Sequence, residues 1–161
     1  MCGIVGGNIK SWNYAKAIES IKHRGPDSQE IRSEDEFTFG FVRLAIIDLD
    51  PRSNQPMYSS DNQFLIVFNG EIYNYKAVKA ILQNHGYKFR TESDTEVALI
   101  AYIHWGAEFL QHIEGMFAIA IYDRAKKEIL ICRDQVGIKP LYYFYDGSRF
   151  AFCSELKGLE A

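Results

Sequence analysis

The sequence lacks the residue patterns that mark several common classes of binding protein. Its formal net charge is only −3, and the 24% of residues that are charged carry both signs. Such a chain offers no basic surface for the phosphates of nucleic acid or for anionic lipid headgroups. No apolar run approaches the length that crosses a bilayer, and the start lacks the basic and apolar segments of a secretory signal. We therefore expect a cytoplasmic protein that binds neither nucleic acid nor membrane.

Metal and phosphate motifs are missing as well. The four histidines form no HxxxH pair and have no neighbouring cysteine. The three cysteines, Cys2, Cys132 and Cys153, are an odd number without CxxC spacing, which fits a reducing compartment better than a disulfide framework. Neither GxxxxGKS/T nor GxGxxG occurs. These absences predict a domain with no metal site and no nucleotide cofactor of its own.

What is present is a chain of 161 residues, 47% of them hydrophobic and 14% aromatic, which is enough for one strand-rich domain over residues 1–161. Short apolar runs predict strands at 3–8, at 37–49 with a break near Gly40, and at 64–69. Helical spacing predicts helices at 13–22, 73–84 and 95–105. From residue 116 onward, four apolar runs separated by turn residues predict a meander of hairpins. Helices laid on stacked antiparallel sheets make a layered α+β domain.

Cys2 stands out chemically, because removal of Met1 would place a thiol and a free α-amine on one residue. A cysteine attacks as its thiolate, with a free pKa of about 8.5, and an α-amine titrates near about 8. The amine can therefore accept the thiol proton near neutral pH. Most cysteines at position 2 have no chemical role, so this interpretation depends on the rest of the sequence.

Six motifs, the first of which contains this cysteine, occur in a familiar order along the chain. They are MCGI at the start, HRGPD at 23–27, RLAIIDL at 43–49, FNGEIYN at 68–74, SDTE at 93–96 and GIKPLYY at 137–143. Together they span nearly the whole chain, which resembles the glutaminase domain of asparagine synthetase, a class II amidotransferase with an N-terminal nucleophile. The resemblance implies a four-layer αββα sandwich of the Ntn-hydrolase type. It also implies hydrolysis of the side-chain amide of L-glutamine to glutamate and ammonia.

The resemblance assigns the catalytic residues. Cys2 would attack the carboxamide through a thioester, and the Asn69 side chain and the Gly70 backbone N–H would stabilise the oxyanion. In isolation, Asn-Gly more often marks a tight turn after a strand. Arg24 and Asp27 of HRGPD match the loop beside the nucleophile, but a fixed turn explains that loop equally well, so they receive no catalytic role.

The resemblance also assigns a substrate pocket. Arg43 would clamp the α-carboxylate of glutamine, and Asp94, helped by Glu71, would take the α-ammonium. Leu44, Ala45, Ile46 and Ile47 would line the pocket, as would Asn69 and Gly70. Two alternatives stay open: Ser93-Asp94-Thr95 suits a helix cap whatever the ligand, and Arg43 suits a scaffold ion pair.

Three departures from the family pattern qualify these expectations. Phe41 stands where the family usually has His, and Gln135-Val136 replaces an Arg-Phe type pair before GIKP. No SGGxDS-type ATP loop occurs before Ala161. We expect ATP and Mg²⁺ only for a synthetase domain or subunit that receives the ammonia, whether this chain is half of a longer enzyme or a stand-alone glutaminase. A homodimer is compatible with the family.

Two rival functions remain at the level of sequence. If Met1 is retained, the Cys2 nitrogen is an amide, and the domain would be a catalytically silent glutamine-binding or partner-docking module. An N-terminal-nucleophile hydrolase that acts on a different amide is the third hypothesis.

Overall fold

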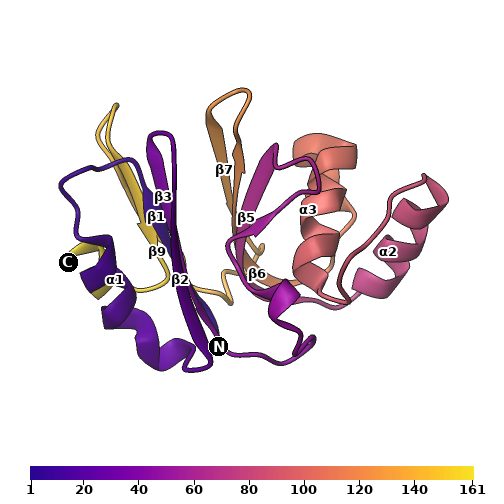
Figure 1. The fold of residues 1–161 in the computed structure, drawn as a ribbon, viewed down its shortest axis with the longest axis horizontal. Coiled ribbons are helices and arrows are strands. Elements are labelled where there is room, and N and C mark those ends of the chain that lie inside the picture. Colours follow the sequence, from indigo (N-terminus) through magenta and orange to yellow (C-terminus); the bar gives the residue numbers. More distant parts are fainter.

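The computed structural model describes all residues, 1–161, and shows four layers (Figure 1). One helical layer, a first sheet, a second sheet and another helical layer follow one another across the molecule. The N-terminus lies between the two sheets at one end of the sandwich. This arrangement confirms the predicted αββα architecture.

The first sheet holds five antiparallel strands in the order β2-β3-β1-β9-β8. They are β1 (Gly3–Gly7), β2 (Ser28–Glu34), β3 (Phe37–Arg43), β8 (Tyr142–Tyr145) and β9 (Phe150–Cys153). β1 lies at the centre, with Gly3 opposite Val42 of β3 and Val5 opposite Cys153 of β9. The strand that follows Cys2 is therefore held along both edges.

The second sheet holds four antiparallel strands in the order β4-β5-β6-β7. They are β4 (Met57–Tyr58), β5 (Phe64–Ile72), β6 (Gly115–Asp123) and β7 (Glu128–Arg133). β5 and β6 pair along their whole length, with Asn69 opposite Ala118. β4 reaches only the first part of β5, so the later residues of β5 have a free edge on that side.

Helices cover the outer face of each sheet (Figure 1). α1 (Tyr14–Ile21) and the short α4 (Leu156–Leu159) lie on the first sheet, and α2 (Tyr75–Asn84) and α3 (Asp94–Trp105) lie on the second. Three 3₁₀ turns complete the elements, at Lys22–Arg24, Pro51–Ser53 and Gly106–Gln111. None of the helices has the length and apolar character needed to span a membrane.

Strand alternation explains the three apolar layers between these elements. On β6, Ile119 and Ile121 face α2 and α3, while Ala118, Ala120 and Tyr122 face the first sheet. Because β5 and β6 bury both faces, their sequences read as continuous apolar runs rather than as alternating ones. A third cluster packs α1 onto the outer face of the first sheet.

The predicted helices and the strands at 3–8 and 64–69 are confirmed to within a few residues, although β5 continues to Ile72. The strand predicted at 37–49 is wrong in two respects. β3 runs through Gly40 without a break, and it ends at Arg43. Gly40 is needed because α1 packs against it: a Cβ there would lie 2.6 Å from the Cδ1 of Ile18. Residues 44–49 leave the sheet, and Ile46 is 73% exposed.

The predicted four-strand meander is also wrong. β6 and β7 form one hairpin in the second sheet, while β8 and β9 form another in the first sheet. Asp134 redirects the chain, because its carboxylate accepts the backbone N–H groups of Phe117, Ile138 and Lys139 at 2.8–3.1 Å. β2 was not predicted at all, since its sequence SQEIRSE is mostly polar at the edge of the sheet.

Candidate active site

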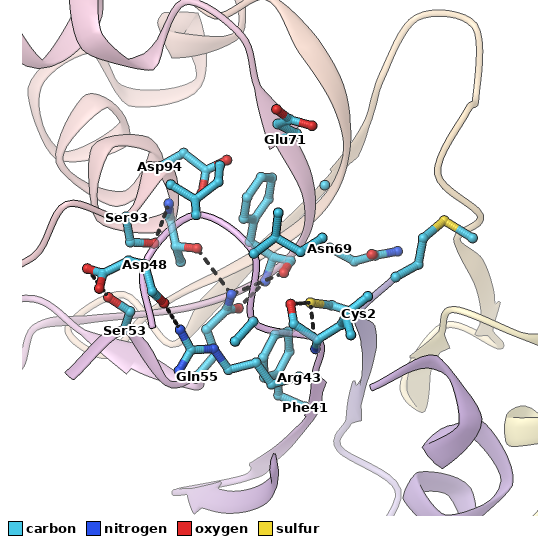
Figure 2. Close-up of a pocket in the computed structure, with 18 of the residues that line it drawn as sticks. Cys2, Phe41, Arg43, Asp48, Ser53, Gln55, Asn69, Glu71, Ser93 and Asp94 are labelled. Atoms are coloured by element: carbon cyan, nitrogen blue, oxygen red, sulfur yellow. Dashed lines mark hydrogen bonds between the residues drawn. The ribbon is translucent and has the colours of Figure 1, made fainter. Parts of the chain in front are cut away.

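A pocket opens at the end of the sandwich where β1 begins, β3 ends and α3 starts (Figure 2). The two sheets both contribute to it, because β3 of the first sheet and β5 of the second both line it. All the predicted site residues line this one pocket, namely Cys2, Arg43, Leu44, Ala45, Ile46, Ile47, Asn69, Gly70, Glu71 and Asp94.

Cys2 presents its thiol to the pocket from the rim of the first sheet. Its Sγ donates to the Leu44 carbonyl at 3.5 Å and accepts the Leu44 N–H at 3.4 Å. Burial raises the pKa of the Cys2 thiol, while the Leu44 N–H, the N-terminal charge and Arg43 act in the opposite direction. The sulfur is held in place, and it needs a nearby base to become a thiolate.

Asn69 brings an unused donor to the same place. It lies on β5 and is only 1% exposed, yet its side-chain nitrogen has no hydrogen-bond partner in the protein. Buried amide nitrogens without a partner are rare, because the lost hydrogen bonds to water cost about 1–3 kcal/mol. An oxygen of a bound molecule would satisfy this donor.

The neighbouring Gly70 offers a second donor on the free edge of β5. Successive residues of a strand direct their N–H groups to opposite edges. On the edge of β5 that faces away from β6, the Phe68 N–H donates to the Gln55 side chain, and the Ile72 N–H donates to the Asp94 carboxylate. The Gly70 N–H lies between these two on the same edge. A side chain at this position would force β5 and β6 apart, since a Cβ would lie 2.2 Å from the Met116 carbonyl oxygen.

Arg43 is a buried cation that has no carboxylate partner. It is 8% exposed and forms no ion pair, which excludes the scaffold ion pair considered above. Its guanidinium donates instead to neutral oxygens of the following loop: the carbonyls of Asp48 and Asp50 and the side chain of Asn54. The Arg43 charge is thus fixed in direction but not neutralised.

Asp94 is the complementary buried anion. It is 5% exposed, has no cation partner, and accepts the Ile72 N–H at 3.1 Å. Burial raises the pKa of Asp94 to about 6, and the charge of Glu71 acts in the same direction. The helix cap is supplied by Ser93, whose hydroxyl accepts the Thr95 N–H at 3.1 Å. The Asp94 carboxylate also receives backbone hydrogen bonds at the start of α3, from Thr95 and from Asp94 itself, so its position is compatible both with a helix-end role and with ligand binding.

The loop 44–54 forms one wall, and its contacts explain its shape. The Ala45 N–H donates to Asp27 at 2.8 Å, which ties the loop to the HRGPD turn. Asp48 accepts the Ser53 hydroxyl at 2.7 Å and the Glu92 N–H at 2.9 Å, which ties it to the start of α3. Figure 2 shows Glu71 apart from Asp94, and it is exposed.

Several residues of the pocket were not predicted from the sequence. Gln55 is buried, and its side-chain amide accepts the N–H of Phe68 and donates to the carbonyl of Phe68. It therefore occupies the edge of β5 next to the Gly70 N–H. Lys139 is 6% exposed, and its ammonium contacts the Met1 sulfur at 3.5 Å. GIKP contains this lysine, but no spacing rule connects it with the pocket. Among the residues that depart from the family pattern, Phe41 is a buried pocket residue and Val136 is 79% exposed.

Comparison with known proteins agrees with this geometry. The glutamine amidotransferase domain family matches the chain over residues 1–161. The chain belongs to this family. It is 42% identical to asparagine synthetase [glutamine-hydrolyzing] 2 of Bacillus subtilis over 99% of this chain and 22% of that protein. It is 43% identical to asparagine synthetase [glutamine-hydrolyzing] 1 of the same organism, over 99% of this chain and 26% of that protein.

This glutamine amidotransferase domain thus spans about a quarter of the length of these relatives. A solved structure, the glutamine phosphoribosylpyrophosphate amidotransferase from B. subtilis complexed with ADP and GMP, superimposes with a TM-score of 0.80. It covers 99% of this chain and 43% of the other, at 22% identity, and so shows the fold alone. The family resemblance and the Ntn-type fold predicted from the sequence are confirmed.

Proposed function

We propose that this glutamine amidotransferase domain hydrolyses the side-chain amide of L-glutamine to glutamate and ammonia. The observation that carries the proposal is a single pocket whose polar and charged groups lack partners of opposite charge or hydrogen-bond partners in the protein. A thiol, an orphaned amide donor, an un-neutralised buried cation and an un-neutralised buried carboxylate all line it.

The two buried charges suit the backbone of a free amino acid. The Arg43 guanidinium would take the α-carboxylate, and the Asp94 carboxylate would take the α-ammonium. A charge-assisted hydrogen bond contributes about 1.5–3 kcal/mol, so the pair distinguishes a free amino acid from a peptide-linked one. Each charge is costly to bury alone, and a zwitterionic ligand neutralises both.

The reaction then follows from the positions of Cys2, Asn69 and Gly70. The Cys2 thiolate attacks the carboxamide carbon, and the Asn69 amide and the Gly70 N–H stabilise the resulting oxyanion. The α-amine of Cys2 takes the thiol proton and passes it to the leaving nitrogen, which departs as ammonia and leaves a thioester. Water, deprotonated by the same amine, hydrolyses the thioester and releases glutamate.

This mechanism requires that Met1 be removed. With Met1 attached, the Cys2 nitrogen belongs to a peptide bond and cannot act as a base. In the structure Met1 is 55% exposed, so it is accessible to a processing enzyme. The Met1-bearing form is the silent glutamine-binding module, because it has no free α-amine on Cys2. Nothing then deprotonates the Cys2 thiol, whose pKa is raised by burial.

The decisive experiment combines intact mass with glutamine hydrolysis. Protein shown by mass to lack Met1 is expected to release ammonia from glutamine and not from asparagine or simple amides. A diazo-ketone analogue of glutamine should label Cys2, and Cys2→Ala should abolish both turnover and labelling. Processed protein that releases no ammonia, with its natural partner supplied, would refute the proposal.

Two other cysteines provide matched controls. Burial raises the pKa of Cys132 to about 12 and that of Cys153 to about 11, and neither residue lines the pocket. Cys132→Ala should keep both turnover and labelling. Label on Cys132 or Cys153 would contradict the assignment of the nucleophile.

The ammonia acceptor is the second part of the proposal. The relatives are named as glutamine-hydrolysing asparagine synthetases, and about three quarters of their length lies outside the match. We propose an ATP-dependent synthetase domain or subunit as the partner, with ATP and Mg²⁺ bound there and no cofactor in this domain. The test is ATP- and aspartate-dependent formation of asparagine from glutamine when that partner is supplied. A homodimer and a cytoplasmic location stay predictions.

A further inference from the structure

The main chain of Cys2 is anchored from outside the pocket by a residue of the HRGPD turn. The Arg24 Nε–H donates to the Cys2 carbonyl oxygen at 2.9 Å, and the Arg24 side chain is 8% exposed. Once Met1 is removed, Cys2 has no preceding residue to fix its orientation. The directions of its thiol and its α-amine then depend on what holds its carbonyl.

Arg24 is itself held by Glu155. The Arg24 Nη1 donates to Glu155 Oε1 at 3.0 Å, and His23 contacts the same oxygen at 2.9 Å. Lys157 lies 3.1 Å from the other oxygen, Oε2. Burial acts to raise the pKa of Glu155, but hydrogen bonds from Arg24, Lys157 and His23 outweigh it and leave the pKa below its usual value. Glu155 is therefore ionised at neutral pH and offers Arg24 a fixed charge.

The residue before Glu155 is fastened to the strand that carries the nucleophile. Ser154 is fully buried; its hydroxyl accepts the Ile4 N–H at 2.9 Å, and its own N–H donates to the Ile4 carbonyl at 2.9 Å. Ile4 is two residues from Cys2. The segment Ser154-Glu155 thus braces the N-terminal strand twice: directly at Ile4, and through Arg24 at Cys2.

We propose that Glu155 is a positioning residue of the glutaminase, which holds Arg24 against the Cys2 carbonyl and so aligns the thiol and the α-amine for attack. This inference rests on the proposed function. Glu155 does not line the pocket, and it acts on the reaction only through Arg24.

The test compares variants of the processed full chain, with glutamine hydrolysis as the readout. Glu155→Gln keeps the size of the side chain but removes the charge that fixes Arg24. We expect kcat to fall about 10- to 100-fold, as a small misplacement of a reacting group does, with KM within about two-fold. The rate of labelling of Cys2 by the diazo-ketone analogue should fall in parallel.

Two further variants separate positioning from general damage to the fold. Glu19→Gln removes an equivalent charge from an exposed ion pair on α1 and should leave kcat unchanged. Arg24→Lys should lower kcat like Glu155→Gln, and the double variant should be no slower than the slower single variant, because both break the same link.

The outcomes distinguish this inference from the proposed function. If the wild type releases no ammonia, the proposed function fails. If the wild type is active and Glu155→Gln keeps its kcat, or if the losses of the two single variants multiply in the double variant, the positioning role of Glu155 is refuted. A loss of kcat matched by an equal loss of folded, labelable protein also refutes it, because Glu155 would then act on stability alone.

Discussion

Replacing Asp94 with asparagine separates substrate binding from folding more clearly than any other change in the pocket. Asn has the same shape, and its side-chain oxygen can still accept the Ile72 N–H. The substitution removes only the negative charge of the Asp94 side chain. The structure predicts that glutamine binding and protein stability respond to this change in opposite directions.

The effect on stability follows from the buried charge. The pKa of Asp94 is raised by burial from 3.8 to about 6, and a shift of this size corresponds to about 3 kcal/mol. Because the folded-state value lies above the unfolded one, the contribution of Asp94 to stability is present at low pH. It is lost as pH rises through about 6. At pH 7.5, Asp94→Asn should therefore keep or raise the free energy of unfolding, by up to about 3 kcal/mol.

The effect on binding has the opposite sign. Without the carboxylate, the α-ammonium of glutamine loses its proposed charge-assisted partner, a contact that contributes about 1.5–3 kcal/mol. We expect KM for glutamine to rise by a factor of about 10 to 100. In the wild type, protonation of Asp94 should raise KM as pH falls below about 6, and the variant should lack this dependence.

Urea unfolding between pH 4 and pH 8 and steady-state ammonia release test both halves. The stability difference between variant and wild type should be largest at pH 8 and should shrink toward pH 4. Glu114→Gln is the control, since Glu114 is exposed, lies outside the pocket and should change stability little. A variant that is less stable at pH 7.5, or that binds glutamine as the wild type does, would refute the reasoning.

Three further predictions concern the rest of the pocket. Arg43→Ala should raise KM for glutamine about 10- to 100-fold with a smaller effect on kcat, because it removes the proposed partner of the α-carboxylate; an unchanged KM in ammonia-release assays would contradict this role. Asn69→Ala should lower kcat by a factor of about 100 or more, with Cys2 still able to react with iodoacetamide; a nearly normal kcat would remove Asn69 from the oxyanion site. Gly70→Ala should destabilise the protein by about 1–3 kcal/mol, because the new methyl group meets the Met116 carbonyl at 2.2 Å; thermal unfolding at the wild-type temperature would show that β5 and β6 can adjust.

The sequence predicted the layers better than it predicted the path of the chain between them. Apolar runs identified the buried strands β1, β5 and β6, because both faces of these strands are covered. β2 could not be found this way, since it is a polar edge strand whose pairing with β3 is a tertiary property. The change of sheet after β7 depends on three backbone bonds to Asp134, and no local pattern predicts it.

The candidate site was predicted through motifs rather than through folding rules. All of its predicted residues meet in one pocket although they come from both sheets, a loop and a helix. Local patterns gave the wrong structure for Leu44 to Ile47, which form a loop because nothing pairs with them beyond Arg43. Gln55 and Lys139 were missed, since they reach the pocket only through the tertiary fold.

Cys2 and Asn69, the proposed nucleophile and oxyanion donor, are positioned by different sheets, because Cys2 directly precedes β1 and Asn69 lies on β5. The spacing between Cys2 and Asn69 is set by the side chains packed between the sheets, among them Phe39, Val67 and Phe152. Because protein interiors are close-packed, a change in the volume of these side chains would shift Cys2 relative to Asn69. Under the proposed function, the packing between the sheets therefore sets the distance between the two reacting groups as well as stabilising the fold.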